Sequence, residues 1–355
     1  MTIYIIILLL CLLGIIFSKR QENNKYAYLI VTLMLIIGAC RDISVGSDTY
    51  GVYPYNFYYT NFNPKSWNAG TPFEPGFNYL IAFFKHYVSK SYTLFYCLLF
   101  LYTFSITIWF LFKKSNNKSI IVFIFYSLGY FFFCMNGMRQ SFAFATALLP
   151  LYFFLLKKKK LLLYGICIIL ISFFLHKSTA IFILIPIIEI FSKKYKFGKK
   201  FLAACIIGSY IFAFVFQDKL FNYLPLLSSF VDERYAMYMN TIQENNGITP
   251  LFKSAMCLLV IYNSRNTKDL FLLIFVVGTI IYNILISFSP TASRAAIHFL
   301  ILGCIPIAEV WTSPKEGNKQ IVRLGLFIYC IIYIIYFYFI KNYDGIIPYS
   351  ISRSL

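Results

Sequence analysis

Long apolar runs, separated by short polar stretches, dominate the pattern of this chain. Runs of this length are typical of membrane-spanning helices rather than of the core helices of soluble proteins. Several are shorter than the roughly 20 residues of an ideal span, a mismatch that tilt or local thinning of the bilayer absorbs. The pattern predicts an all-α, polytopic membrane protein with about 12 transmembrane helices. The runs cover residues 2–17, 26–40, 92–112, 119–134, 139–156, 161–175, 178–191, 201–217, 251–263, 270–287, 295–311 and 324–340.

One further apolar segment, 77–88, either crosses the membrane or lies in its interface. It is short, contains two basic residues and follows Glu74-Pro75-Gly76. If it crosses, the basic loop at 113–118 lies on the opposite side from the basic loop at 157–160. If it lies in the interface, every basic cluster between spans is cytoplasmic, as the positive-inside rule requires. We therefore expect an extracytoplasmic interfacial helix after Glu74 and both chain termini outside.

Composition fits one integral membrane domain over residues 1–355. Sixty per cent of the residues are hydrophobic and only 13% are charged, about half the charge of a soluble domain. The net charge of +19 is concentrated between apolar runs, so we expect no nucleic-acid partner. The 9 cysteines occur singly without a CxxC pair, which predicts neither a disulfide framework nor a zinc site. Two long external segments result, 41–91 with the interfacial helix and 218–250.

This topology gathers the chemically unusual residues on the external face, although it was derived from the basic loops alone. A guanidinium fork matches two phosphate oxygens, so the arginines at span ends are candidate phosphate ligands, with interfacial anchoring as the competing explanation. The amide side chains of Asn136 and Gln140, close to Arg139 in the sequence, are suited to binding sugar hydroxyls. The candidate binding residues are Arg41, Arg139, Gln140, Arg234, Arg294 and His298, the last lying one helical turn from Arg294.

Three residues on the same face are candidate acid–base groups. Asp48 follows Gly46 in the first external segment, Glu74 opens the interfacial helix, and His176 sits in a very short turn. A neutral imidazole there could accept a proton, although a lone histidine more often has a structural task. Arg234 lies among tyrosines that either stack on sugar rings or form an interfacial belt.

Several motifs are absent from the sequence. It contains no Walker A loop, no GxGxxG after a strand, no HExxH and no DxD suited to a nucleotide-sugar metal site. We therefore expect no cofactor and no metal, and a substrate that arrives already activated from the membrane or from outside.

Five motifs in order resemble the EpsG-like family of Wzy-type polymerases of bacterial surface polysaccharides. The resemblance runs over roughly 40–300; each motif alone is weak, and their order is more specific. Gly46-Ser47-Asp48-Thr49 departs mildly from the Gly-Thr-Asp expected, without disturbing the aspartate. The motifs are Arg41…Gly46…Asp48…Tyr50/Tyr53, Glu74-Pro75-Gly76-Phe77, Met138-Arg139-Gln140, His176-Lys177-Ser178-Thr179-Ala180 and Arg234-Tyr235.

The resemblance implies a GT-C-like membrane fold in the bacterial inner membrane, with its active site facing the periplasm or exterior. It implies transfer of a growing glycan from undecaprenyl pyrophosphate to a lipid-linked repeat unit, in the synthesis of O-antigen, capsule or exopolysaccharide. The partners would be the lipid-linked donor and acceptor, membrane lipid, and a chain-length regulator and flippase of the same pathway.

Mechanistically, we expect the arginines to bind the pyrophosphate and Asp48, then His176, then Glu74, to act as the base. Direct displacement would invert the anomeric carbon without a metal ion. Three alternatives stay open: a flippase for the lipid-linked oligosaccharide, a membrane O-acetyltransferase, and a structural partner in an export complex.

Overall fold

The computed structural model of the protein describes residues 1–21, 24–68, 73–157, 160–228, 248–287, 290–314 and 319–352. Within these ranges the chain is helical, and its β-structure is one isolated antiparallel bridge between Arg41 and Ile351. Every predicted apolar run coincides with helix, so the all-α prediction is confirmed. The chain divides into two compact units, Met1–Phe182 with Cys330–Leu355 and Ile183–Tyr329.

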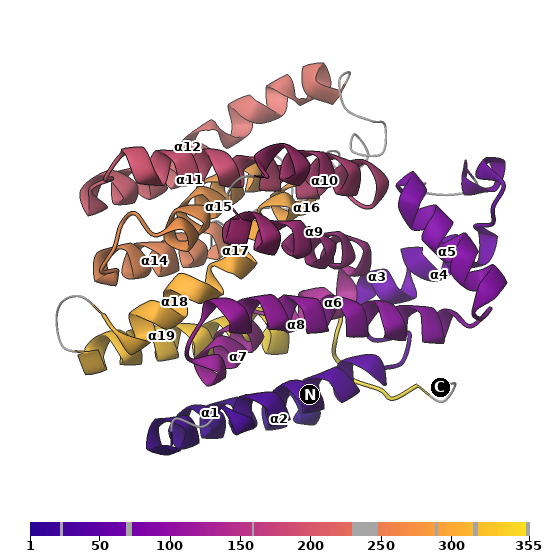
Figure 1. Cartoon of the computed structure of the whole chain (residues 1–355), viewed down its shortest axis with the longest axis horizontal. Helices are drawn as coiled ribbons and strands as arrows, with labels where there is room; N and C mark the ends of the chain where they lie inside the picture. Colours follow the sequence, from indigo (N-terminus) through magenta and orange to yellow (C-terminus); the bar gives the residue numbers. More distant parts are fainter. Residues whose placement is uncertain are drawn as a thin grey trace. The chain divides into compact units, whose positions relative to one another are not determined.

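The first unit is built on long helices that lie side by side, α1 against α2 and α6 against α9 (Figure 1). Its elements are α1 (Thr2–Gln21), α2 (Lys25–Ala39), α3 (Ser47–Tyr50), α4 (Val52–Tyr59), η1 (Pro64–Asn68), α5 (Pro75–Tyr87), α6 (Tyr92–Lys114), α7 (Lys118–Ser127), α8 (Tyr130–Asn136), α9 (Met138–Lys157), α10 (Leu161–Phe174), the start of η2 (Lys177–Ile183), the end of α19 (Lys319–Ile334) and η4 (Ile335–Ile340).

The polar residues between the apolar runs determine where several helices begin. Ser91 Oγ accepts a hydrogen bond from the Leu94 N–H at 3.2 Å, and Asn117 Oδ1 accepts one from the Ile120 N–H at 3.2 Å. Such caps satisfy main-chain donors that the first helical turn leaves open. Pro75, which needs no such partner, occupies the first turn of α5.

The helices include membrane spans. Among the described residues, four helices are long and apolar enough to cross a bilayer, and a fifth span results if the bent pair α7–α8 counts as one. The shorter apolar helices that the structure describes coincide with the predicted runs 2–17, 26–40, 161–175, 251–263 and 270–287. The protein is therefore a multi-pass membrane protein, while the total of about 12 spans stays a prediction. The four long helices are Tyr92–Lys114, Met138–Leu156, Arg294–Thr312 and Lys319–Ile340.

The apolar run 119–134 is two helices, not one. α7 and α8 meet at an angle of 61°. Gly129 at the junction has a φ of 78°, a left-handed conformation that favours glycine, and the Tyr338 ring packs directly against its Cα. The bend is thus set by one glycine and by a side chain from the far end of the sequence.

The segment predicted to form an interfacial helix is helical: α5 begins directly after Glu74, and its position at the interface stays a prediction. Its 13 residues extend about 20 Å, too short for a span. One face, including Phe77 and Phe84, packs into an aromatic cluster with α4 and α6, while Tyr79 and Phe83 are exposed. This amphipathic arrangement agrees with a helix that lies at the membrane surface.

The helices of the first unit carry different chemistry at their two ends. Lys118 at the start of α7 lies 4.7 Å from the Tyr28 ring near the start of α2, and Lys114 at the end of α6 lies 5.4 Å from the Tyr152 ring near the end of α9. The opposite ends of α2 and α9 lead to Arg41 and Arg139. Lys114 and Lys118 therefore lie at the opposite helix ends from Arg41 and Arg139, while the side of the membrane that each end faces stays a prediction.

The second unit contains a neutral polar network between its helices. Asn283 Nδ2 donates to Ser209 Oγ at 3.0 Å and to Ser254 Oγ at 2.9 Å, joining α15 to α12 and α14. All three side chains are buried. The elements are α11 (Leu184–Lys194), α12 (Lys199–Ser228), α14 (Ile248–Asn263), α15 (Leu270–Ile286), α16 (Pro290–Ser293), η3 (Arg294–Ala296), α17 (Ile297–Leu302), α18 (Cys304–Thr312) and most of α19.

Candidate functional site

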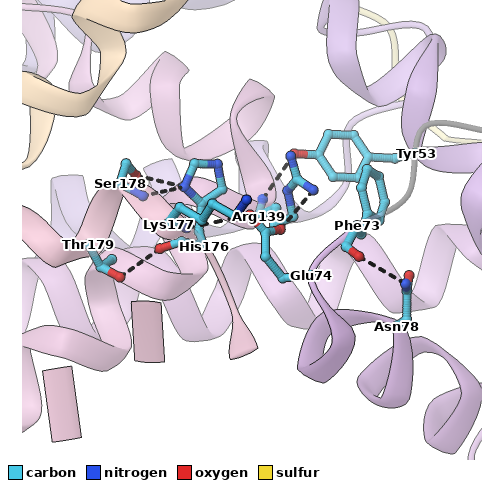
Figure 2. A network of polar contacts seen from close by, with 9 residues as sticks. All are labelled: Tyr53, Phe73, Glu74, Asn78, Arg139, His176, Lys177, Ser178 and Thr179. Carbon is cyan, nitrogen blue, oxygen red and sulfur yellow. Dashed lines mark hydrogen bonds and ion pairs between the residues drawn. The ribbon is translucent and has the colours of Figure 1, made fainter. Parts of the chain in front are cut away.

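The predicted site residues of the first unit converge on the short turn between α8 and α9, residues 136–139. Gly137 breaks the helix there, so Asn136 ends α8 and Met138 begins α9. Figure 2 shows the network on one side of this turn, around Arg139.

Arg139 forms an ion pair with Glu74. Its Nη1 lies 2.9 Å from Glu74 Oε2, with side-chain exposures of 21% for the arginine and 6% for the carboxylate. The guanidinium also stacks over the Phe73 ring at 4.3 Å, and the Arg139 N–H donates to the Tyr53 hydroxyl at 3.1 Å. The arginine is thus held by a carboxylate and an aromatic ring (Figure 2), while part of its side chain remains exposed.

Glu74 connects Arg139 to the turn that follows α10. Its Oε1 accepts a hydrogen bond from the Lys177 N–H at 3.4 Å. Gly76 makes this approach possible, because a Cβ at that position would lie 2.7 Å from the main-chain oxygen of Phe174. Glu74 therefore contacts segments that lie far apart in the sequence.

His176 opens that turn and is partly buried. Its Nδ1 accepts a hydrogen bond from the Ser178 N–H at 3.2 Å and lies 2.7 Å from Ser178 Oγ, while Thr179 Oγ1 donates to the His176 carbonyl at 2.7 Å. Because a main-chain N–H can only donate, the neutral ring carries its proton on Nε2. The turn fixes both the orientation and the tautomer of the imidazole.

Arg41 is fully buried, and its contacts are with main-chain carbonyls. Its guanidinium donates to the oxygens of Gly38 and Met135 and stacks on the rings of Tyr96 and Phe100, 4.8 and 5.3 Å from their centroids. Burial lowers the pKa of this guanidinium, an effect that Tyr96 partly opposes. These contacts hold the end of α2 against the end of α8.

Asp48 lies on the single-turn helix α3, on the other side of the 136–139 turn. Its N–H donates to Asn136 Oδ1 at 2.8 Å, and the neighbouring Thr49 Oγ1 donates to the Met135 carbonyl at 3.2 Å. Gly46, with a φ of 107°, makes the reversal that begins this turn. The Asp48 side chain is half-buried.

The structure thus brings Asp48, Glu74, Arg139 and His176 to one end of the first unit. Gln140 is also there and buried, directly after Arg139. Arg294 and His298 belong to the second unit, where Arg294 begins η3 and His298 is fully buried in α17. Arg234 lies outside the described residues.

One acidic residue of this region escaped the sequence analysis. Asp344 is 7% exposed, and its Oδ1 accepts a hydrogen bond from Asn136 Nδ2 at 3.2 Å. The sequence contains a signal for it. Asp344 and Gly345 follow the last apolar run, 324–340, just as Gly46 and Asp48 follow the run 26–40.

The comparisons with known proteins give one match. The model of the EpsG family matches residues 25–351, which include every site residue described above. The comparison with curated proteins and that with solved structures gave no match. Since the matched segment covers nearly the whole chain, the protein belongs to the EpsG family, a family of membrane proteins of polysaccharide biosynthesis.

Proposed function

We propose that the protein is a polysaccharide polymerase that transfers a growing glycan from a lipid pyrophosphate to a lipid-linked repeat unit at the extracytoplasmic face. One observation carries this proposal. A single turn, residues 136–139, contacts the Asp48 turn through Asn136 and carries Arg139, so a carboxylate and an accessible guanidinium lie at the same end of the unit. That pair suits a reaction in which a hydroxyl loses a proton and a pyrophosphate departs.

In the proposed step, Asp48 accepts the proton of the acceptor hydroxyl as its oxygen attacks the anomeric carbon. The bond from that carbon to the pyrophosphate oxygen breaks, and its electron pair leaves with the pyrophosphate. Arg139 stabilises the charge that develops there, because its fork can engage two phosphate oxygens. Direct displacement inverts the anomeric carbon, and the positive charge comes from arginine without a metal ion.

Glu74 has a different role in this scheme from that of a first base. Its carboxylate is 6% exposed and accepts from Arg139 and from the Lys177 N–H. A carboxylate engaged in this way holds the guanidinium in place. His176, the second candidate base from the sequence, has its Nδ1 lone pair engaged by the Ser178 N–H, so in this tautomer it would meet the substrate as an Nε2–H donor rather than as a base.

The remaining predicted ligands extend the same proposal. Gln140 beside Arg139 would bind sugar hydroxyls, and Arg294 of the second unit, with Arg234, would bind further parts of the donor or acceptor. His298 is fully buried in α17, so it would support its helix rather than contact the substrate. Arg41 would support the site through its contact with Met135 rather than through the substrate.

The membrane arrangement in this proposal is a GT-C-like fold of about 12 spans in the bacterial inner membrane. By the positive-inside rule, the lysine-rich end of the first unit faces the cytoplasm and the Arg139 end faces the periplasm or exterior. The glycan donor and acceptor are then carried by undecaprenyl pyrophosphate on the outer leaflet, and a flippase and a chain-length regulator act with the protein.

Arg139→Ala tests the proposal in cells that lack the native gene. We expect loss of long-chain polysaccharide well beyond any fall in the amount of protein in the membrane, which is measured alongside because the substitution also leaves the Glu74 carboxylate without its ion pair. Arg265→Ala, at an exposed arginine between α14 and α15, is the matched control and should leave chain length unchanged. Normal polymer length in Arg139→Ala would refute the role assigned to this residue.

The position of the lipid-linked precursor separates the alternatives. A cell without a polymerase accumulates single repeats on the outer leaflet, whereas a cell without a flippase accumulates them on the inner leaflet. Loss of an O-acetyltransferase would leave chain length normal and remove acetyl groups. Single repeats on the inner leaflet would therefore overturn the proposed function.

A further inference from the structure

The end of the chain returns to the candidate site. The C-terminal segment (residues 342–352) runs along the loop that follows α2, where the Asp42 N–H donates to the Ser350 carbonyl at 2.9 Å and the Ser352 N–H donates to the Cys40 carbonyl at 3.0 Å. Arg41 and Ile351 form the antiparallel bridge between the two stretches. The first external segment thus has a main-chain partner from the opposite end of the sequence.

The same pairing continues into the turn that carries Asp48. The Gly46 N–H donates to the Gly345 carbonyl at 3.0 Å, and the Ser47 N–H donates to the Asp344 carbonyl at 3.0 Å. Gly345 has a φ of 63°, and a Cβ there would lie 3.2 Å from the Ser47 nitrogen. The Asp344–Gly345 pair therefore fits closely against the start of α3.

Asn136 joins this pair to Asp48 through its side-chain amide. Its Oδ1 accepts from the Asp48 N–H at 2.8 Å, while its Nδ2 donates to Asp344 Oδ1 at 3.2 Å and to Ser47 Oγ at 3.3 Å. Asn136 is 1% exposed and Asp344 7%. One amide thus uses both of its ends to connect three segments, and the carboxylate of Asp344 fixes which end faces Asp48.

We propose that Asn136 and Asp344 are positioning residues that hold the Asp48 turn in its reactive orientation, so that the C-terminal segment completes the active site. This proposal rests on the role assigned to Asp48 in the proposed function. A base displaced by about 1 Å can lose on the order of 100-fold in rate, which is the scale of effect that such support controls.

The test exchanges the two side chains. Asn136→Asp alone places two carboxylates in contact, and Asp344→Asn alone places two amides there. The double variant Asn136→Asp/Asp344→Asn restores one amide and one carboxylate, and position 136 still offers an oxygen to the Asp48 N–H. We expect each single variant to lower turnover by roughly 10- to 100-fold, with the KM for the lipid-linked acceptor within about threefold of wild type. The double variant should recover to within about threefold of wild-type turnover.

Two further readouts distinguish positioning from simple structural support. In Asn136→Asp the activity relative to wild type should rise as the pH falls, because a proton shared between the two carboxylates removes their repulsion. Hydrogen exchange of the Asp48 amide in purified protein should accelerate in the single variants and return to the wild-type rate in the double variant. Lys341→Ala, an exposed neighbour in the sequence, should change neither readout.

The proposal would be overturned if the double variant were as inactive as the single variants and the hydrogen exchange of its Asp48 amide stayed fast. Single variants with wild-type turnover, or variants whose activity falls only in proportion to the amount of protein in the membrane, would overturn it as well. The two proposals fail separately. If Asp48→Asn leaves polymer unaffected, the proposed base is wrong, yet restored amide protection in the double variant still supports the connection through Asn136.

Discussion

The two units of this protein contain polar networks of opposite character. In the first unit, Glu74 and Arg139 form an ion pair at one end of the helices, and the Arg139 side chain is 21% exposed. In the second unit, Ser209, Ser254 and Asn283 form a neutral network that is buried between three helices. The first network keeps a charged side chain accessible to a ligand. The buried side chains of the second network hydrogen-bond to one another.

The energetic reasons for keeping such groups differ as well. Neutral hydrogen bonds between membrane helices contribute about 0.6 kcal/mol on average, which suits a device for helix association. Charged groups at membrane depth are costly and are retained where they bind or react. The comparison predicts that changes in the first network affect the proposed transfer reaction and that changes in the second affect assembly of the helices.

Among the variants that test this contrast, Glu74→Gln is expected to have the largest effect, on polymer synthesis. The neutral amide cannot balance the guanidinium charge, so Arg139 loses its fixed position; we expect polymer synthesis to fall on the order of 100-fold. Chain length on polysaccharide gels and protein amount in the membrane measure the two consequences separately. Asn56→Ala is the control, since its amide donates to the Val52 carbonyl within its own helix, α4. Wild-type polymer in Glu74→Gln would show that the ion pair does not support the reaction.

An intermediate effect, on stability rather than on activity, is expected for Asn283→Ala. The substitution removes the donor to both serines and should lower the free energy of unfolding by about 1 kcal/mol, with unchanged activity per folded molecule. Thermal unfolding in detergent and the specific activity of the purified protein measure this. Asn263→Ala, whose amide contacts its own helix, is the matched variant. A loss of specific activity at full stability would assign the second network to the site and erase the contrast.

The smallest effect is expected for Ser178→Ala. The substitution removes the hydroxyl that lies 2.7 Å from His176 Nδ1, but the main-chain N–H of residue 178 continues to donate to that nitrogen. Since the tautomer is kept, activity should fall by no more than about threefold, the loss of one modest hydrogen bond. Ser172→Ala, at the Lys177 carbonyl, provides the comparison. A loss as large as that of His176→Ala would mean that the hydroxyl itself takes part in the reaction.

Much of the fold can be predicted from the hydrophobic pattern. The positions of the lysine and arginine clusters predict at which end of the helices the site residues lie. The apolar runs mark the helices because their length leaves few alternatives, and the basic loops separate the two ends. That reasoning places Glu74, Arg139 and His176 on one face without any knowledge of their contacts. The short helix α5 was predictable in the same way, because Glu74-Pro75-Gly76 precedes it.

The contacts themselves were not predictable, because they depend on packing between distant segments. Nothing in the sequence pairs Glu74 with Arg139 rather than with another cation, and the bend at Gly129 depends on Tyr338. The pairing of the C-terminal segment with the loop after α2 could not be predicted, because it is made mainly by main-chain groups, which every residue type except proline carries in full. Arg41 illustrates the same limit: a guanidinium at a span end reads as a phosphate ligand, and its contacts are with carbonyl groups.

The return of residues 342–352 to the Asp48 turn also bears on the order in which the protein is made. A ribosome adds about 5–20 residues per second, so the loop after α2 leaves it well before its hydrogen-bonding partners exist. During that interval the Gly46 and Ser47 amides must bind water or lipid headgroups instead. A nascent chain, or one terminated before residue 342, therefore inserts its helices with an unfinished Asp48 turn, and residues translated much later complete it.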